Sequence, residues 1–178
     1  MKKLVLILFI VSANFISYSQ INPDNIEIVR DHYGVPHIYA DLDTEVAYGF
    51  AWAQAEDHFK LIQEAYLAGN GLLGKLIGLK GAGADFLTQF IQSEKIVNEK
   101  FHTLDEKFVA LIDAFAQGLN AFATKHPKQV LEKNLFPLTP QKLLRYTQLQ
   151  LFISNGADKL VTGIVNNTLS APFEINNC

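Results

Sequence analysis

The chain has 178 residues, enough to bury one core, and a single domain is the expectation. Its 15 basic and 18 acidic residues give a formal net charge of -3 at pH 7, and the basic residues are scattered singly. This pattern suits a solvated surface and argues against a nucleic-acid partner. The single cysteine, Cys178, excludes an internal disulfide, so packing or a partner must hold the fold together.

Residues 1–19 have the pattern of a secretory signal peptide. Two lysines at the start are followed by an apolar segment at 4–11 and by small residues before a cleavage site after Ser19. The apolar segment is interrupted by polar residues and is shorter than the roughly 20 residues of a membrane-spanning helix, which argues against a membrane anchor. We expect an exported protein, periplasmic or secreted, that starts at Gln20 and is not held in a membrane. Its net charge is then -5, because the leader removes two lysines and no acid.

Residues 26–40 predict a β-hairpin. Apolar and polar residues alternate in part at 26–30 and again at 37–40. Gly34 can take the positive φ of a tight turn, and Pro36 stands where a strand can begin without donating a ladder hydrogen bond.

A long helix and a glycine-rich stretch follow the hairpin. Asp43 or Thr44 can cap the helix, and apolar residues at mostly helical spacing extend it to about Leu67. The glycines at 69–83 then predict a loop or a broken helix that is ordered by what it lies against.

Two more helices are expected in the second half of the chain. Residues 103–106 fit a capping box with Thr103 as the N-cap, and the apolar stripe after them ends near Pro127. Thr139 is a cap for the last helix, whose first turn can accommodate a proline. That helix is apolar nearly all round at 143–153, so it should be buried in something larger than the rest of this chain.

The motifs that could carry chemistry on their own are weak. Residues 69–75 match the spacing of a phosphate-binding loop, but Leu76 replaces the required Ser or Thr and a helix precedes the loop. The acidic pair and histidine at 56–58 should point in different directions on a helix, so they do not form an acid-base cluster. No metal-binding spacing is found among His32, His37, His58, His102 and His126. We expect no catalytic residue in this chain and no required cofactor.

Two sequence blocks resemble the start of the α subunit in the penicillin acylase family. The first, at 28–40, has the sequence IVRDHYGVPHIYA, and the second, at 47–57, has the sequence AYGFAWAQAED. The likeness continues in a G-x-N-A pattern at 118–121 and in the Leu-Thr-Pro step at 138–140. It covers nearly all of residues 26–165, and the family includes penicillin G, acyl-homoserine-lactone and aculeacin-type acylases.

The resemblance implies an α+β, mainly helical fold, the α-chain part of an αββα N-terminal-nucleophile hydrolase. In that family an exported precursor cuts itself into an α chain, a spacer and a β chain, whose first residue, usually Ser, is the nucleophile. Its own α-amino group, with a pKa of about 8, accepts the hydroxyl proton, and β-chain donors hold the oxyanion. Residues 20–178 are then an incomplete α-subunit-like region that follows a signal peptide at 1–19. Without the β chain it is expected to be inactive.

Ser154 and Cys178 are candidate nucleophiles by residue type, but neither replaces the missing one. The Ser-Asn-Gly step at 154–156 lies inside the apolar helix, before the expected cleavage region, and is interpreted as a helix kink. Cys178 ends a chain, whereas the nucleophile must begin one.

The resemblance also assigns part of the acyl pocket to the last helix. Carried over without gaps, it places Phe152, Gly156, Lys159 and Leu160 near the acyl group of the substrate, where burial of each CH₂ contributes about 0.8 kcal/mol. The other interpretation is that Phe152 and Leu160 are ordinary core residues. The Lys-Leu pair replaces an Arg-Phe pair of penicillin G acylases, so a phenylacetyl specificity is not implied. Asn166 stands at the family's α-chain calcium-ligand position, and its uncharged amide makes a structural calcium in the full-length protein an open question.

Two functions therefore remain open. In the first, the chain is the α-chain portion of an exported acylase that hydrolyses a linear amide bond in a penicillin, an acyl-homoserine lactone or a related N-acyl substrate. Its partner is the β chain of the same precursor. In the second, the chain is a catalytically dead exported module that binds acyl groups, or a remnant. The first predicts an unstable isolated chain, and the second predicts a well-behaved monomer that binds acyl ligands without hydrolysing their amides.

Overall fold

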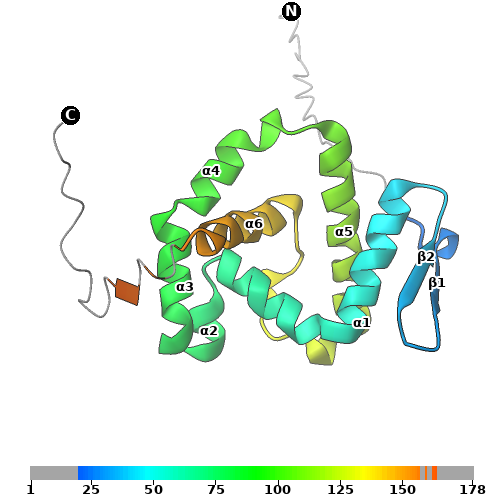
Figure 1. The fold of residues 1–178 in the computed structure, drawn as a ribbon, viewed down its shortest axis with the longest axis horizontal. Coiled ribbons are helices and arrows are strands. Elements are labelled where there is room, and N and C mark those ends of the chain that lie inside the picture. The colour runs from blue at the N-terminus through cyan, green and yellow to red at the C-terminus, as the bar shows by residue number, and fades with distance from the viewer. Residues whose placement is uncertain (1–19, 157–158, 160–161, 164–178) are drawn as a thin grey trace, which may run out of the picture.

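The computed structural model describes residues 20–156, 159, 162 and 163. It confirms a mainly helical fold that starts with a two-stranded antiparallel hairpin, β1 (Glu27–Arg30) and β2 (Pro36–Tyr39) (Figure 1). Short 3-10 turns lie at Pro23–Asn25, Phe101–Thr103, Pro127–Gln129 and Lys133–Leu135. The helices of this part are α1 (Asp43–Gly69), α2 (Leu73–Ile77), α3 (Leu79–Phe90), α4 (Ser93–Lys100), α5 (Glu106–Lys125) and α6 (Pro140–Ser154).

The hairpin has the turn and register that its sequence predicts. Gly34 has a φ of 83°, and Pro36 is the first residue of β2. Ile28 pairs with Ile38, so the two apolar side chains share one face of the hairpin. That face lies against α1 at Gly49, where a Cβ atom would come within 2.8 Å of the Ile38 side chain. The small residue therefore allows close contact between the hairpin and the helix.

Helix α1 is the longest element, and it is bent. The predicted caps, Asp43 and Thr44, are both inside the helix, and the backbone N–H of Leu42 donates instead to the carboxylate of Glu45 at 3.2 Å. The bend lies at His58, whose φ of -140° and ψ of 31° are not helical. Beyond the bend the helix continues to Gly69.

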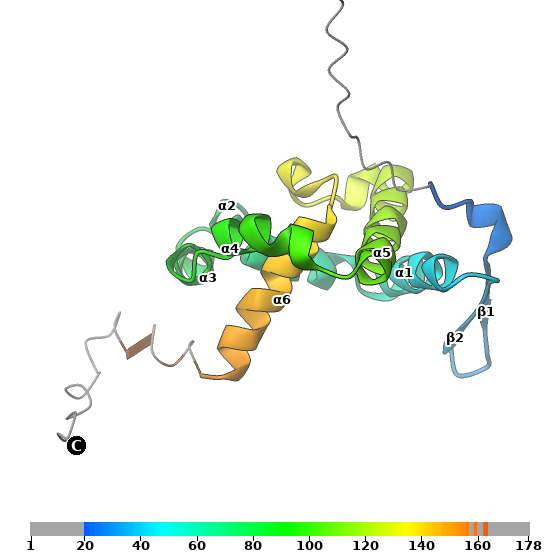
Figure 2. The ribbon, with the colours of Figure 1, turned by 90° about the horizontal axis from the view of Figure 1, so that it is seen from above.

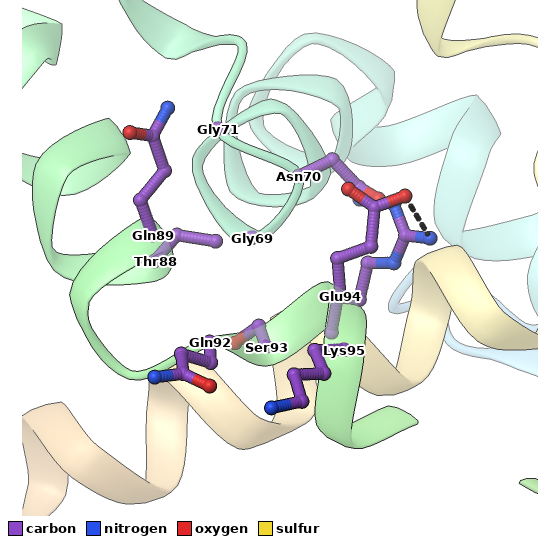
Figure 3. Close-up of a pocket in the computed structure, with 10 residues that line it drawn as sticks. Gly69, Asn70, Gly71, Thr88, Gln89, Gln92, Ser93, Glu94 and Lys95 are labelled. Carbon is purple, nitrogen blue, oxygen red and sulfur yellow. Dashed lines mark hydrogen bonds and ion pairs between the residues drawn. The ribbon is translucent and has the colours of Figure 1, made fainter. Parts of the chain in front are cut away.

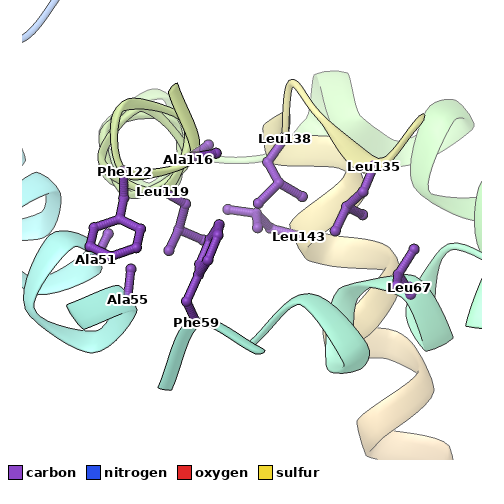
Figure 4. Packing of buried hydrophobic residues seen from close by; sticks show 11 residues of the cluster. Ala51, Ala55, Phe59, Leu67, Ala116, Leu119, Phe122, Leu135, Leu138 and Leu143 are labelled. Carbon is purple, nitrogen blue, oxygen red and sulfur yellow. The ribbon is translucent and has the colours of Figure 1, made fainter. Parts of the chain in front are cut away.

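The main core lies between α1, α5, α6 and the segment that joins α5 to α6 (Figure 4). The Phe122 ring stands nearly edge-on to two rings of α1, 5.3 Å from Trp52 and 4.9 Å from Phe59. At Gly118 a Cβ atom would collide with the backbone carbonyl of Tyr48, so α1 and α5 approach closely there. Burial of these apolar side chains is the main stabilising contribution to the fold.

Helix α6 lies in the middle of a frame formed by α1, α3, α4 and α5 (Figure 1). Leu143 and Leu149 are buried, but the C-terminal end of the helix projects out of the layer of the other helices (Figure 2). Leu151 is 60% exposed and Phe152 is 42% exposed. The helix that the sequence predicted to be apolar nearly all round is thus only half covered. Within the described residues no helix is both long and apolar enough to cross a membrane.

Two further local predictions need correction, and two are confirmed. Thr103 does not cap α5, because Asp105 is the N-cap and accepts from the backbone N–H of Phe108 at 3.0 Å. The glycine-rich stretch forms two helices, α2 and α3, in agreement with the broken helix that was one of its two predicted conformations. Helix α6 ends at the Ser-Asn-Gly step instead of kinking, since Gly156 takes a φ of 85°. Thr139 caps α6 as predicted.

Candidate functional site

Arg30 joins the two sequence blocks that carry the family resemblance. From the end of β1 its guanidinium reaches α1, where Nη2 lies 3.1 Å from a carboxylate oxygen of Glu56 and 3.0 Å from one of Asp57. Nη1 also donates to the carbonyl oxygen of Gly34 at 2.9 Å, which fastens the hairpin turn. The hydrogen bonds that Arg30 donates, first to Glu56 and then to Asp57, raise the pKa of Arg30 above its ordinary value.

The acidic pair of α1 is therefore engaged in a structural link. Sequence reasoning expected residues 56–58 to diverge, but both carboxylates meet on one guanidinium that comes from outside the helix. The second oxygen of Glu56 accepts from the indole N–H of Trp52 at 3.0 Å. The residue spacing within the helix could not have predicted this ion pair, since Arg30 is 26 residues away from Glu56 and lies outside the helix.

The predicted acyl-pocket residues lie at the exposed end of α6. Phe152 is in the last turn of the helix, Gly156 follows the helix end in a left-handed conformation, and Lys159 is exposed beyond it. Leu160 and Asn166 lie outside the described residues. The structure places Phe152 beside other exposed apolar side chains, Leu151 and Ile153, rather than in the core.

An apolar groove runs beside this end of α6. It has a volume of about 290 Å³ and lies between α4, the turn after it and α6. Its apolar lining includes Ile96, Val97, Leu104, Leu144 and Leu151. Leu151 belongs both to the groove and to the exposed helix end, so the groove reaches the end of α6.

A second, more polar cavity of about 470 Å³ lies where the end of α1, the turn between α3 and α4, and the middle of α6 meet (Figure 3). Gly69–Gly71, from the segment with phosphate-loop spacing, line part of it. The backbone N–H groups of Leu73 and Gly74 do not face a ligand, because each donates to the carboxylate of Asp85 at 2.8 Å. This arrangement agrees with the rejection of a phosphate-binding loop.

The histidines form no metal centre in the part of the chain that the structure describes. No group of three or more His, Cys, Asp or Glu side chains there could hold a metal ion. His37 faces the carboxylate of Asp31 at 3.4 Å across the hairpin. His126 lies against Phe122, with ring centres 4.2 Å apart. These two histidines therefore have packing or hydrogen-bonding roles.

A sequence model of the penicillin amidase family matches residues 25–163. Penicillin G acylase of Escherichia coli is 25% identical over 139 residues, which cover 75% of this chain and 16% of that protein. The penicillin acylase 2 proenzyme of Pseudomonas sp. (strain SE83) is 23% identical, over 65% of this chain and 15% of its own length. The acyl-homoserine lactone acylase PvdQ of Pseudomonas syringae pv. syringae is 23% identical, over 80% of this chain and 20% of its own length.

The same fold is found in a solved structure. It is the thermostable penicillin G acylase from Alcaligenes faecalis, with a TM-score of 0.57 and 18% sequence identity over 86% of this chain and 97% of the compared chain. The present chain spans less than a quarter of the length of the three curated relatives described above. The family match nevertheless extends from the start of β1 past the end of α6. The chain belongs to the penicillin amidase family.

Proposed function

We propose that this chain is the α-chain portion of an exported acylase that hydrolyses a linear amide bond of an N-acyl substrate. The family match covers residues 25–163, whereas the chain spans only 16% of one full-length relative. It also spans 97% of one chain of a solved acylase, so a chain of this length occurs as a separate piece in that structure. The leader at 1–19 supports export, to the periplasm or out of the cell.

The exposed end of α6 is the observation that carries this proposal. A soluble protein rarely leaves a continuous apolar surface open unless a partner or a ligand covers it. Leu151, Phe152 and Ile153 are each at least 42% exposed, and Leu151 also lines the apolar groove. The β chain of the same precursor would cover the groove, and the acyl group of the substrate would pack against Phe152.

The chemistry itself belongs to the partner chain in this proposal. The β chain supplies the N-terminal nucleophile and the donors of the oxyanion hole, and the α chain supplies the wall that recognises the acyl group through Phe152, Gly156, Lys159 and Leu160. No cofactor is required. A structural calcium ion in the complete protein would gain at most one neutral oxygen from Asn166. The α chain alone would be inactive.

Expression of the complete gene, beyond the codon for Cys178, tests the proposal. The purified product should hydrolyse phenylacetyl or N-acyl-homoserine-lactone amides, and residues 20–178 alone should not. Phe152→Ala should lower kcat/KM for the preferred acyl chain by at least about fourfold, the equivalent of one buried CH₂ group. Phe108→Ala is a matched control, because Phe108 is 43% exposed and lies on α5.

Two results would contradict the proposal. A complete product that binds N-acyl ligands but hydrolyses none of them would identify a catalytically dead binding module. An active product in which Phe152→Ala behaves like Phe108→Ala would remove α6 from the acyl pocket.

A further inference from the structure

Three side chains on the wall of the Figure 3 cavity carry a buried polar atom that has no hydrogen-bond partner among the described residues. The atoms are Asn70 Oδ1, Ser93 Oγ and Arg145 Nε. Asn70 donates both amide protons, to the carbonyl oxygens of Tyr66 at 2.8 Å and Lys142 at 3.0 Å. Its orientation is therefore set, and its remaining oxygen needs a donor. Unpaired buried atoms cost free energy until a molecule in the cavity bonds to them.

Arg145 brings an incompletely paired charge to the same cavity. Its side chain is 16% exposed, and the carboxylate that pairs with it at 3.0 Å, Glu94, is 72% exposed. Water screens such a carboxylate, and the bond to Glu94 uses only one of the five N–H donors of the guanidinium. Lys95 adds a second positive charge to the wall.

The N-terminus of α4 lines the cavity as well. Gln92 precedes the helix in a left-handed conformation with a φ of 53°, and its side chain does not cap the helix. The first N–H groups of a helix have no acceptor within the helix, so they favour an anion. Ser93, the first residue of α4, is 0% exposed, and rotation about its χ1 bond can turn the hydroxyl toward a ligand.

We infer that this cavity binds a small carboxylate that also carries a hydrogen-bond donor, such as an α-hydroxy or α-amino acid. The carboxylate oxygens accept from Arg145 and from the start of α4, and the donor of the ligand satisfies the free oxygen of Asn70. The cavity, of about 470 Å³, is within the usual range of small-molecule sites, roughly 300 to 1,000 Å³. The inference does not depend on the proposed acylase activity.

Isothermal titration calorimetry on the protein made from the complete gene tests this site. The probes are sodium glycolate and sodium acetate, with sodium chloride as the ionic control. Glycolate should bind saturably and more tightly than acetate, which lacks the donor group. Arg145→Gln should weaken glycolate binding about 10- to 100-fold, the usual effect of losing hydrogen bonds to a charged group. Lys107→Gln, which removes an exposed positive charge on α5, should leave binding unchanged.

Ser93→Ala keeps the test decisive if Arg145→Gln does not fold. It removes one unpaired hydroxyl without leaving a buried charge, so the variant should fold and bind glycolate several-fold more weakly. A protein that gives no saturable heat with glycolate would overturn the inference, and so would one that binds glycolate and acetate equally. Binding that survives both substitutions unchanged would overturn it as well.

Discussion

Arg30 and Asp57 are 27 residues apart in the sequence, yet Nη2 of the arginine lies 3.0 Å from a carboxylate oxygen of the aspartate. The contact joins the end of β1 to α1 one residue before the helix bends at His58. The two sequence blocks of the family resemblance therefore meet in one ion-pair link. This link connects the hairpin to the helix.

Arg30→Ala should loosen this junction. The variant leaves Glu56 and Asp57 side by side without a positive charge, so we expect a fall of a few degrees in Tm and a red shift in the emission of Trp52, which bonds to Glu56. Arg30→Lys should recover part of the Tm, because lysine keeps the charge but not the planar fork. The difference from wild type should shrink in about 1 M salt, where charges are screened within about 3 Å. Unchanged emission in Arg30→Ala would show that the link does not position Trp52.

The close contact between α1 and α5 makes a second prediction. Gly118→Ala forces a Cβ atom into the carbonyl of Tyr48, so the variant should lose about 1 to 3 kcal/mol of unfolding free energy. Gly83→Ala is the matched control, because Gly83 is an exposed residue of α3 and a Cβ atom there meets nothing within 4 Å. The control should gain about 0.4 to 1 kcal/mol through helix propensity and a more restricted unfolded chain. Urea unfolding measures both, and equal stability of the two variants would contradict the close approach.

Sequence reasoning succeeded where a local rule decided the conformation. Gly34 supplied the positive φ of the hairpin turn, Pro36 began a strand, and Thr139 capped α6. It failed at Thr103, because Asp105 lies closer to the true helix start and is an equally good cap. It also failed at Gly156, where a glycine that could mark a kink ends the helix instead.

The candidate site was harder to predict because its parts come from distant segments. The acyl-pocket residues are predicted from the resemblance alone, and nothing in the local pattern of α6 distinguishes a residue of a pocket wall from a residue of the core. The cavity beside Arg145 was missed entirely, because Asn70, Ser93 and Arg145 belong to three elements that only the tertiary fold brings together. Periodicity indicates which face of a helix is apolar, but it does not show what that face meets.

Asn120 in the G-x-N-A pattern gives a third prediction. Its side chain bonds twice to the backbone of Leu138, accepting from the N–H at 2.7 Å and donating to the carbonyl oxygen at 2.9 Å. Leu138 is 3% exposed, so water does not readily replace these bonds. Asn120→Ala should therefore lower the free energy of unfolding by about 2 to 6 kcal/mol, the sum for two buried groups left unpaired.

The control for this variant is Asn98→Ala on α4, which removes an exposed asparagine. It should be neutral or slightly stabilising, because alanine is the better helix former. Chemical denaturation followed by circular dichroism compares the two variants. If Asn120→Ala were as stable as Asn98→Ala, the connection between α5 and α6 would not depend on this pair of bonds.

Tyr66 makes the stability of the fold sensitive to alkaline pH. Burial first, and then the nearby Tyr146, raise the pKa of Tyr66 from 10.0 to about 12. Below pH 10 both the folded and the unfolded chain keep the proton, so the contribution of the neutral phenol is fully present. Above pH 10 the unfolded chain ionises first, and the contribution is lost as the pH rises through about 12. Two pKa units correspond to at most about 2.7 kcal/mol.

Tyr66→Phe separates this effect from general alkaline unfolding. The variant has no phenol to ionise at that position, so its unfolding free energy should fall less steeply between pH 10 and 12 than that of the wild type, and it should keep the edge-on ring contact with Tyr146 at 5.3 Å. Tyr33→Phe is the control, because Tyr33 is 81% exposed and water surrounds it before and after unfolding. Urea titrations at a series of pH values give the slopes. Parallel slopes in wild type and Tyr66→Phe would show that the phenol of Tyr66 is not shielded by the packing of α1 against α6.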